Sequence, residues 1–260
     1  MKKLLAYIII ASTLLITLSA CGNSNGSADG DQAKLVIGVD DKFAPMGFRD
    51  ENNELTGFDI EYAKAAGEAM GMEVTFQPID WKTKETELSS GRIDLIWNGY
   101  TITNDRKEKV LFTKPYLENE QVIVTKADSS IDRLEDLSDK DVALQALSSA
   151  ADALNGSPVR QTVKSITEYA DNVLALTDLK AGRVDAVVID EVVIDYYMAK
   201  EEGQFKVLDE SLSSELYGIG VKKGNEALLD KLQNALNQLN DDGTAEKISQ
   251  KWFGESKVLK

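Results

Sequence analysis

The sequence predicts an α/β fold of two lobes joined by a two-strand hinge. Two short stretches nearly repeat each other, residues 89–96 (SSGRIDLI) and 180–187 (KAGRVDAV). Each indicates the end of a helix, a glycine turn and an apolar strand. Apolar runs alternate with helical patterns over about 230 residues, enough for one large core or two smaller ones. The chain is also expected to cross between the lobes twice, near Thr125 and near Tyr217.

The first lobe is predicted to consist of residues 32–124 and 218–260. Its strands are short apolar or alternating runs, and its helices carry apolar residues at helical spacing. Asp59 is a plausible N-cap for the first helix. In chain order we expect a strand at 35–39, a helix at 59–70, a strand at 73–77, a helix at 83–90, a strand at 121–125 leaving the lobe, a returning strand at 218–221, a helix at 225–240 and a last helix that includes Trp252.

The second lobe is predicted to consist of residues 125–217. Its strand at 142–144 is followed by a helix that Ser148 and Ser149 open. A segment at 165–170 leads to a helix that ends near Ala181, before the second repeated block. Asp190 is then expected to cap a helix that runs through Ala199.

The segments after the two repeated strands differ in charge. The first strand leads to residues 98–106 (NGYTITNDR), which are mostly small and polar and end in Arg106; the second leads to Asp190 and Glu191. Ligands of open α/β sheets bind at the carboxyl ends of the strands. Facing strand ends would therefore offer a cation on one lobe and an anion on the other. A free amino acid, with its carboxylate and ammonium, is the smallest common metabolite that matches both.

The N-terminus has the pattern of an export signal. Lys2 and Lys3 precede an apolar run over residues 4–20, and small residues lead to Cys21, the only cysteine. This pattern resembles a bacterial lipobox, in which the cysteine is lipid-modified and becomes the new N-terminus. The alternative is an uncleaved transmembrane anchor with an incidental cysteine. Residues 23–31 are rich in Gly, Ser, Asn and Asp and indicate a flexible tether.

Charge and composition exclude several function classes. Removal of residues 1–20 takes away two lysines and no acids, which leaves 27 basic and 44 acidic residues, a net charge of −17. Nucleic acid and anionic membrane surfaces do not suit such a chain. The chain has no histidine, so histidine-based nucleophilic catalysis, histidine metal sites and the usual general base near neutral pH are excluded. We expect no cofactor, no metal and no catalytic residue.

Across nearly the whole mature chain, the ordered motifs resemble the amino-acid-binding proteins of ABC importers, family 3 of the extracellular solute-binding proteins. The resemblance implies a periplasmic-binding-protein-like fold of type II. Its specificity comes from the order and spacing of the motifs rather than from any one of them. The matching segments are 43–46 (FAPM), 57–60 (GFDI), 91–94 (GRID), 101–106 (TITNDR), 112–116 (FTKPY), 182–185 (GRVD), 190–191 (DE), 242–244 (DGT) and 252–253 (WF).

The resemblance implies how the α-carboxylate of the ligand is held. Arg106 would bind it with a two-pronged guanidinium, a geometry that lysine cannot copy. The hydroxyl and amide of Thr101 would donate to the same carboxylate. Backbone amides at Ser148 and Ser149 would join from the second lobe, at a helix N-terminus that favours anions. Relatives usually have glycine where this chain has Leu147, so this loop is expected to approach the ligand less closely.

The resemblance also assigns the rest of the site. The Gly99 carbonyl and the Asp190 carboxylate would hold the α-ammonium. Phe43 and Trp81 would form walls around the ligand side chain, and Asp40 and Asn98 would line its far end. Five of these residues also have a structural interpretation: Arg106 as part of a charged helix start, Asp190 as an N-cap, Asp40 as a surface acid, and the aromatic residues Phe43 and Trp81 as core.

These observations predict a lipid-anchored receptor that binds a polar amino acid and delivers it to the permease subunits of an ABC transporter. We expect a monomer on the outer face of a Gram-positive-like cell membrane. Asp40 and Asp41 favour a basic amino acid or cystine, whereas Asn98 and Trp81 would equally suit glutamine. The main alternative is an enzyme on the same fold, such as a cyclohexadienyl dehydratase-like lyase. A second alternative is the sensing domain of a receptor kinase, which would need a following transmembrane helix.

Overall fold

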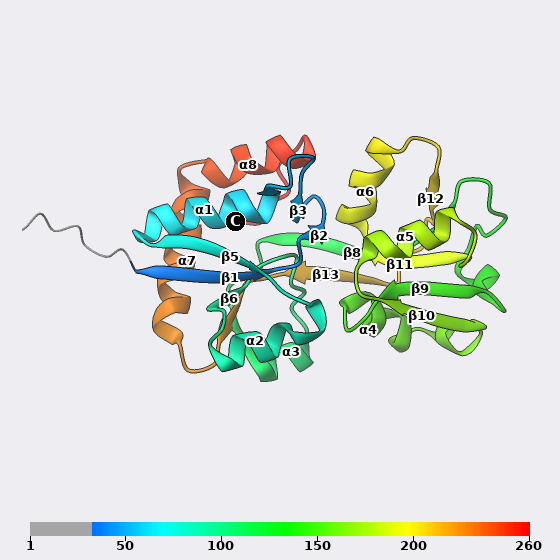
Figure 1. Cartoon of the computed structure of the whole chain (residues 1–260), viewed down its shortest axis with the longest axis horizontal. Helices are drawn as coiled ribbons and strands as arrows, with labels where there is room; N and C mark the ends of the chain where they lie inside the picture. Colours follow the sequence, from blue (N-terminus) through cyan, green and yellow to red (C-terminus); the bar gives the residue numbers. More distant parts are fainter. Residues whose placement is uncertain (1–32) are drawn as a thin grey trace, which may run out of the picture. The chain divides into compact units, whose positions relative to one another are not determined.

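The computed structural model describes residues 33–260, which form two main β-sheets with helices packed against both (Figure 1). The first sheet consists of β1 (Lys34–Val39), β5 (Glu73–Pro78), β6 (Leu95–Ile96), β7 (Val110–Phe112) and β14 (Gly220–Lys222). Its strand order is β5-β1-β6-β14-β7. Strands β5, β1 and β6 are parallel, and β14 is antiparallel to both of its neighbours.

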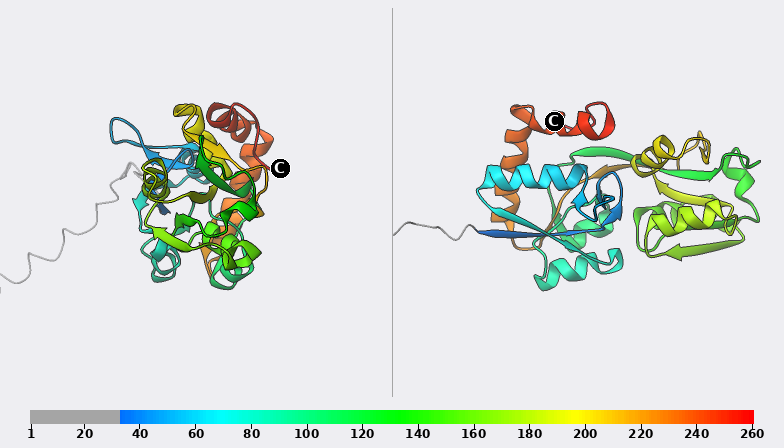
Figure 2. Two further views of the ribbon diagram at one scale, coloured as in Figure 1. Left: turned by 90° about the vertical axis from the view of Figure 1, so that its right-hand side faces the viewer. Right: turned by 45° about the horizontal axis from the view of Figure 1, so that its top comes forward.

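Helices cover both faces of the first sheet. In Figures 1 and 2 the first and last helices lie on one side of the sheet, and the two short helices that flank β6 in sequence lie on the other. The helix that begins at Glu226 and the last helix both pack against the first. The C-terminal segment therefore belongs with the first sheet and its helices, which together form the first half of the molecule; the second sheet and its helices form the second half. These helices are α1 (Phe58–Met70), α2 (Lys84–Ser90), α3 (Asn104–Lys109), α7 (Glu226–Asp241) and α8 (Thr244–Phe253).

The second sheet has the order β10-β9-β11-β8-β12, with β13 also paired to β8. β9, β10 and β11 are parallel, and β8 is antiparallel to its partners. Its helices are α4 (Ser149–Gly156), α5 (Asn172–Lys180) and α6 (Glu191–Lys200). Its strands are β8 (Leu117–Lys126), β9 (Asp141–Gln145), β10 (Ser165–Tyr169), β11 (Ala186–Asp190), β12 (Phe205–Val207) and β13 (Ser213–Tyr217).

Two antiparallel strands, β8 and β13, connect the halves. Leu117 at the start of β8 pairs with Tyr217 at the end of β13, and bridges also reach Thr101 and Val258 in the first half. The predicted fold class, two α/β lobes joined by two strands, is therefore confirmed. The sequence did not predict β13 as a strand, and the lobe limits at 124/125 and 217/218 stay a prediction.

Smaller elements complete the described chain. A three-stranded antiparallel sheet follows β1, and its strands are β2 (Lys42–Phe43), β3 (Gly47–Arg49) and β4 (Leu55–Thr56). Single 3-10 turns cover Trp81–Thr83, Leu134–Leu137 and Pro158–Gln161. Within residues 33–260, no helix has the length and apolarity needed to span a bilayer. The predicted signal peptide, Cys21 and the tether lie outside the described residues.

The two repeated blocks fold in the same way. Gly91 ends α2 and Gly182 follows α5, both with a positive φ, of 77° and 69°. The aspartate three residues later exchanges two hydrogen bonds with a neighbouring strand. Asp94 donates its amide to the Val36 carbonyl and accepts the Val36 amide on its carboxylate; Asp185 does the same with Asp141. The repeated GRxD pattern thus joins each strand to its parallel neighbour.

Candidate functional site

Arg106 is a buried cation that pairs with no acidic side chain of the described residues. It lies on α3, whose N-cap residue, Thr103, accepts the Arg106 amide on its side chain at 3.1 Å. Only 4 % of Arg106 is exposed, and its guanidinium lies 4.8 Å from the centre of the Tyr100 ring. The neighbouring acids Asp105 and Glu85 pair with lysines instead, and within residues 33–260 no carboxylate lies within 4.0 Å of the guanidinium. A buried charge without a counter-ion is costly, so this position favours an anionic ligand.

Asp190 is a buried carboxyl group, and among residues 33–260 no lysine or arginine lies within 4.0 Å of it. It occupies the N-cap position of α6, but its side chain makes no capping hydrogen bond, so the prediction that its carboxylate caps this helix is wrong. The Oδ1 atom accepts hydrogen bonds from three side chains on the connecting strands: Tyr217 Oη at 2.6 Å, Gln121 Nε2 at 2.8 Å and Asn119 Nδ2 at 2.9 Å. Burial, with the charge of Glu215 in addition, raises the pKa of Asp190 to about 7.

Thr101 links the cation to the anion. Its carbonyl accepts from Arg106 Nη1 at 3.0 Å, and its hydroxyl donates to Glu215 Oε2 at 2.9 Å. The same hydroxyl lies 3.0 Å from the Ser149 hydroxyl of the second half. Gln121 then donates to both Glu215 and Asp190. Arg106 and Asp190 therefore belong to one buried network where the two halves meet.

Asp40 and Asn98 are two further buried polar side chains of the first half. Asp40 is 7 % exposed and accepts from Gln145 Nε2 of β9 at 2.7 Å, another contact between the halves. Burial is the main cause that raises the pKa of Asp40 to about 6. Asn98 is 1 % exposed, and neither its amide nitrogen nor its oxygen has a hydrogen-bond partner within the part of the chain that the structure describes. An unpaired buried polar atom costs about 1–3 kcal/mol, so a polar ligand group that bonds to Asn98 would recover this free energy.

The loop at residues 147–149 is held from the first half by a lysine. Ser148 is the N-cap of α4 and also donates from its hydroxyl to the Gln145 carbonyl at 2.7 Å. The Leu147 carbonyl accepts from Lys84 Nζ at 2.9 Å. Lys84 is 2 % exposed, and burial, aided by the nearby charge of Arg106, lowers its pKa to about 8. This lysine thus places a second buried cation near Arg106.

Gly99 has no space for a side chain. Its φ is 57°, and a Cβ atom there would lie 2.7 Å from Phe43 and 3.1 Å from Tyr217. Its amide donates to Asp59 Oδ2 at 2.8 Å. Asp59 is fully buried and also accepts from the side chains of Trp97 and Tyr116, and burial raises its pKa to about 7.

The predicted cap Asp59 and the predicted ligand walls Phe43 and Trp81 are all buried side chains. Asp59 is not a helix cap, because α1 begins at Phe58 with Gly57 at the N-cap and the Asp59 carboxylate supports Gly99 instead. Trp81 packs edge-on against Tyr100 at 5.9 Å within a small apolar cluster, and Phe43 belongs to the largest apolar cluster. Both aromatic residues are buried, and their role as walls for a ligand stays a prediction.

Several residues of this network were not predicted from the sequence as site residues. Most lie on the connecting strands, where no motif marks them. Asn119, Gln121, Glu215 and Tyr217 come from β8 and β13; Gln145, Lys84 and Asp59 come from β9, α2 and α1.

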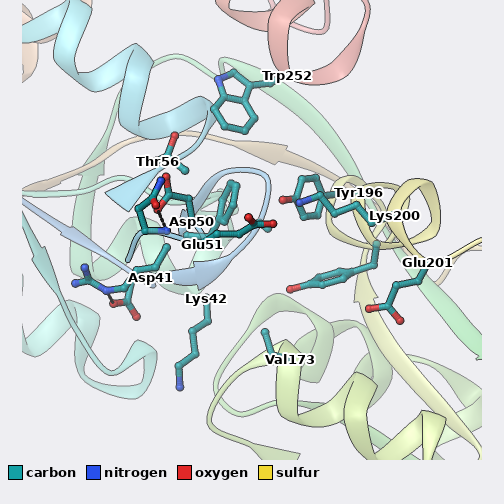
Figure 3. A pocket seen from close by; sticks show the side chains of 15 residues that line it. Asp41, Lys42, Asp50, Glu51, Thr56, Val173, Tyr196, Lys200, Glu201 and Trp252 are labelled. Atoms are coloured by element: carbon teal, nitrogen blue, oxygen red, sulfur yellow. Dashed lines mark hydrogen bonds and ion pairs between the residues drawn. The ribbon is translucent and has the colours of Figure 1, made fainter. Parts of the chain in front are cut away.

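A separate pocket of about 830 Å³ lies at one outer edge between the halves (Figure 3). Figure 3 shows Trp252 of α8 facing Tyr196 and Lys200 of α6 across it. Phe48 of β3 contacts Tyr196 with ring centres 5.4 Å apart. None of the predicted ligand-binding residues lines this pocket, so it is distinct from the network of Arg106 and Asp190. No group of three or more potential metal ligands occurs among residues 33–260.

Two α/β halves joined by paired strands form the fold of a two-lobed solute-binding protein. Comparison with known proteins gives the family. The family model for bacterial extracellular solute-binding proteins, family 3, matches residues 35–255, and the chain belongs to this family.

Named relatives are amino-acid-binding proteins. The arginine-binding extracellular protein ArtP of Bacillus subtilis is 32% identical over 256 residues, covering 97% of this chain and 98% of the relative. The L-cystine-binding protein TcyJ of Escherichia coli is 30% identical, covering 86% and 84%. A crystal structure of an ABC uptake transporter substrate-binding protein from Streptococcus pneumoniae with bound histidine superposes with a TM-score of 0.85. Its identity is 40%, and the match covers 87% of this chain and 95% of that one.

Proposed function

We propose that this protein binds a free polar amino acid between its two halves and delivers it to the permease of an ABC transporter. The main supporting observation is the pair of buried opposite charges in one network. Among residues 33–260, no carboxylate pairs with Arg106 and no lysine or arginine pairs with Asp190, and the two are joined through Thr101, Glu215 and Gln121. An α-carboxylate at Arg106 and an α-ammonium at Asp190 would neutralise both.

The remaining predicted residues complete this assignment. Thr101 and the amides at Ser148 and Ser149 would donate to the α-carboxylate, and the Gly99 carbonyl would accept from the α-ammonium. Phe43 and Trp81 would contact the ligand side chain. Asp40, Asn98 and Gln145 offer it a carboxyl group and two amides, which suit a basic amino acid, cystine or glutamine.

Binding and delivery by this protein would leave the ligand chemically unchanged. The two named relatives are amino-acid-binding proteins, and the similar solved structure is that of an ABC uptake transporter substrate-binding protein. The chain also has no histidine to serve as an acid or base. Hydrogen bonds to charged groups contribute about 1.5–3 kcal/mol each. Four to six of them, after the costs of closure and ligand ordering, reach about 8 kcal/mol, the free energy of a micromolar complex.

A thermal-shift screen of the purified mature chain against the common amino acids and cystine tests this function. A ligand at a thousandfold excess over its Kd should add about 4 kcal/mol of stability. The bound ligand should then be recovered chemically unchanged. No stabilisation by any amino acid would contradict the proposal, and recovery of a converted product would favour the dehydratase-like alternative.

We further propose that Cys21 carries the lipid that anchors the protein to the outer face of the cell membrane. The family is extracellular, and the sequence before Cys21 has the pattern of a lipoprotein signal. A palmitate-labelled chain is expected to lose its label and leave the membrane fraction in the Cys21→Ser variant. Retention of that variant in the membrane would instead support the transmembrane-anchor alternative.

A further inference from the structure

Glu215 lies at the centre of the network although no motif marks it. It is the middle residue of β13 and pairs in register with Asn119 of β8. Its Oε2 atom accepts from Thr101 Oγ1 at 2.9 Å, from Gln121 Nε2 at 3.1 Å and from Asn119 Nδ2 at 3.3 Å. Glu215 therefore receives hydrogen bonds from the first half and from a connecting strand at once.

The donors of Glu215 are shared with Asp190. Asn119 Nδ2 and Gln121 Nε2 each donate to both carboxylates. Two negative groups that share the same neutral donors repel each other, and this repulsion is relieved only by a proton or a cation. In the described part of the chain, no lysine or arginine lies within 4.0 Å of either carboxylate, and nearby Lys257 pairs with Glu255. The pair is thus arranged to receive a positive charge from outside.

We propose that Glu215 is a second carboxylate of the ammonium site, acting beside Asp190. This inference rests on the proposed function and extends it, because it assigns the α-ammonium two anionic partners from different strands. A compact ammonium with three N–H donors suits such an arrangement, since it can donate to both carboxylates and to the Gly99 carbonyl. Because β13 is a connecting strand, ligand contact at Glu215 also ties the hinge to the bound ligand.

The acid–base state of the pair supports this assignment. The groups that face Asp190 are Glu215 and Tyr217 of β13, and the centre of the Tyr217 ring lies 6.4 Å from that of Tyr116. Arg106 is connected to this group through its hydrogen bond to the Thr101 carbonyl. On β8, Glu118 and Glu120 alternate with Asn119 and Gln121 and point to the opposite face. Burial and the charge of Glu215 raise the pKa of Asp190 to about 7, whereas a bound ammonium favours its ionised form. Ligand binding near pH 7 is therefore expected to release protons.

Calorimetry of the mature chain tests this role. The probe is L-arginine, or lysine, glutamine or cystine if the thermal screen selects one of these. Titrations at pH 7 in two buffers with different ionisation enthalpies give both the affinity and the number of protons released. The variants are Glu215→Gln, which keeps the shape and removes the charge, and Glu215→Asp, which keeps the charge. Glu118→Gln, an exposed acid on the facing connecting strand, is the matched control.

The expected result separates a ligand contact from a purely structural role. Glu215→Gln should weaken binding about tenfold, the value of a hydrogen bond to a charged group, and should reduce proton release, because the pKa of Asp190 falls once the neighbouring charge is removed. Glu215→Asp should retain proton release, and Glu118→Gln should match the wild type. An affinity within twofold of the wild type with unchanged proton release would overturn the inference about Glu215. Failure of the wild type to bind any amino acid would instead overturn the proposed function.

Discussion

The two repeated blocks have the same local structure and different endings. In both, an arginine after the glycine pairs with an acid five residues earlier on the preceding helix: Arg92 with Glu87, and Arg183 with Asp178. In both, the following aspartate binds the neighbouring parallel strand. The repeated residues thus build the sheets, and the residues that differ come after the strands and carry the charges of the candidate site. The residues that both blocks share therefore support the fold, whereas the segments that differ after the strands contribute to the candidate site.

The two charged ends of the site also differ in how the fold assembles them. Arg106 takes its hydrogen bond and its aromatic contact from residues no more than six positions away in sequence. Asp190 takes its hydrogen bonds from residues 27, 69 and 71 positions away. The cationic end is therefore a local structure, whereas the anionic end forms only when β8, β11 and β13 have paired.

The largest expected effect is that of removing the cation. Arg106→Ala should weaken amino-acid binding by about 3–5 kcal/mol, because the ligand carboxylate would then be buried without its charged partner. Arg183→Ala is the matched control: it removes an arginine whose side chain is 60% exposed and which lies in the scaffold part of the second block. Calorimetry should find near wild-type affinity for this control. Similar losses in both variants would contradict the division between scaffold and site.

Asp190→Asn should have the second largest effect. The amide keeps the size of the side chain but removes the charge opposite the ligand ammonium, so affinity should fall by about 1.5–3 kcal/mol. Asp185→Asn, in the same block but on the scaffold side, should leave the affinity unchanged. An Asp190→Asn variant that binds as tightly as the wild type would remove Asp190 from the ammonium site.

The same variant has a pH signature without ligand. The folded-state pKa of Asp190, about 7, lies above the ordinary value of 3.8, so its contribution to stability is fully present below about pH 4 and is lost as the pH rises through 7. Ligand-free Asp190→Asn should therefore lose less stability than the wild type between pH 4 and 7. Urea unfolding across this range measures the difference, and parallel curves would contradict the raised pKa.

Sequence reasoning succeeded where local patterns carry the information. Apolar periodicity predicted most helices and strands of both halves. The polar segment after the first repeated strand, which ends in Arg106, predicted the cation of the candidate site. It failed at Glu215 and Asn119, because nothing local marks side chains that meet only after two distant strands pair. It also passed over Lys84, since charged residues are rarely buried and only the fold supplies its partner carbonyl.

The repeated aspartates allow a comparison of stability between the halves. Asp94→Ala leaves the partly buried amide of Val36 without its acceptor and should lower the free energy of unfolding by about 1–3 kcal/mol. Asp185→Ala exposes the amide of Asp141 to water at the surface, so the loss should be about 0.5–1 kcal/mol. Urea unfolding of the ligand-free variants tests this order. A larger loss for Asp185→Ala would show that the equivalent residues of the two blocks differ in more than exposure.

The smallest expected effect concerns the two left-handed residues next to the site, Gly99 and Leu147. Gly99 must be glycine because Phe43 occupies the space of a side chain, whereas Leu147, at a φ of 54°, is 59% exposed. The leucine side chain extends into solvent, so it fits at this left-handed position without a clash. Leu147→Gly should relieve about 1–2 kcal/mol of left-handed strain and lose about 0.5–1 kcal/mol through chain entropy, a small net gain in the free energy of unfolding.

The control is Asp139→Gly, at a φ of 58° away from the site, which should gain less stability because aspartate tolerates this conformation. If thermal unfolding finds Leu147→Gly clearly destabilised, then the leucine side chain makes a stabilising contact that its exposure does not suggest.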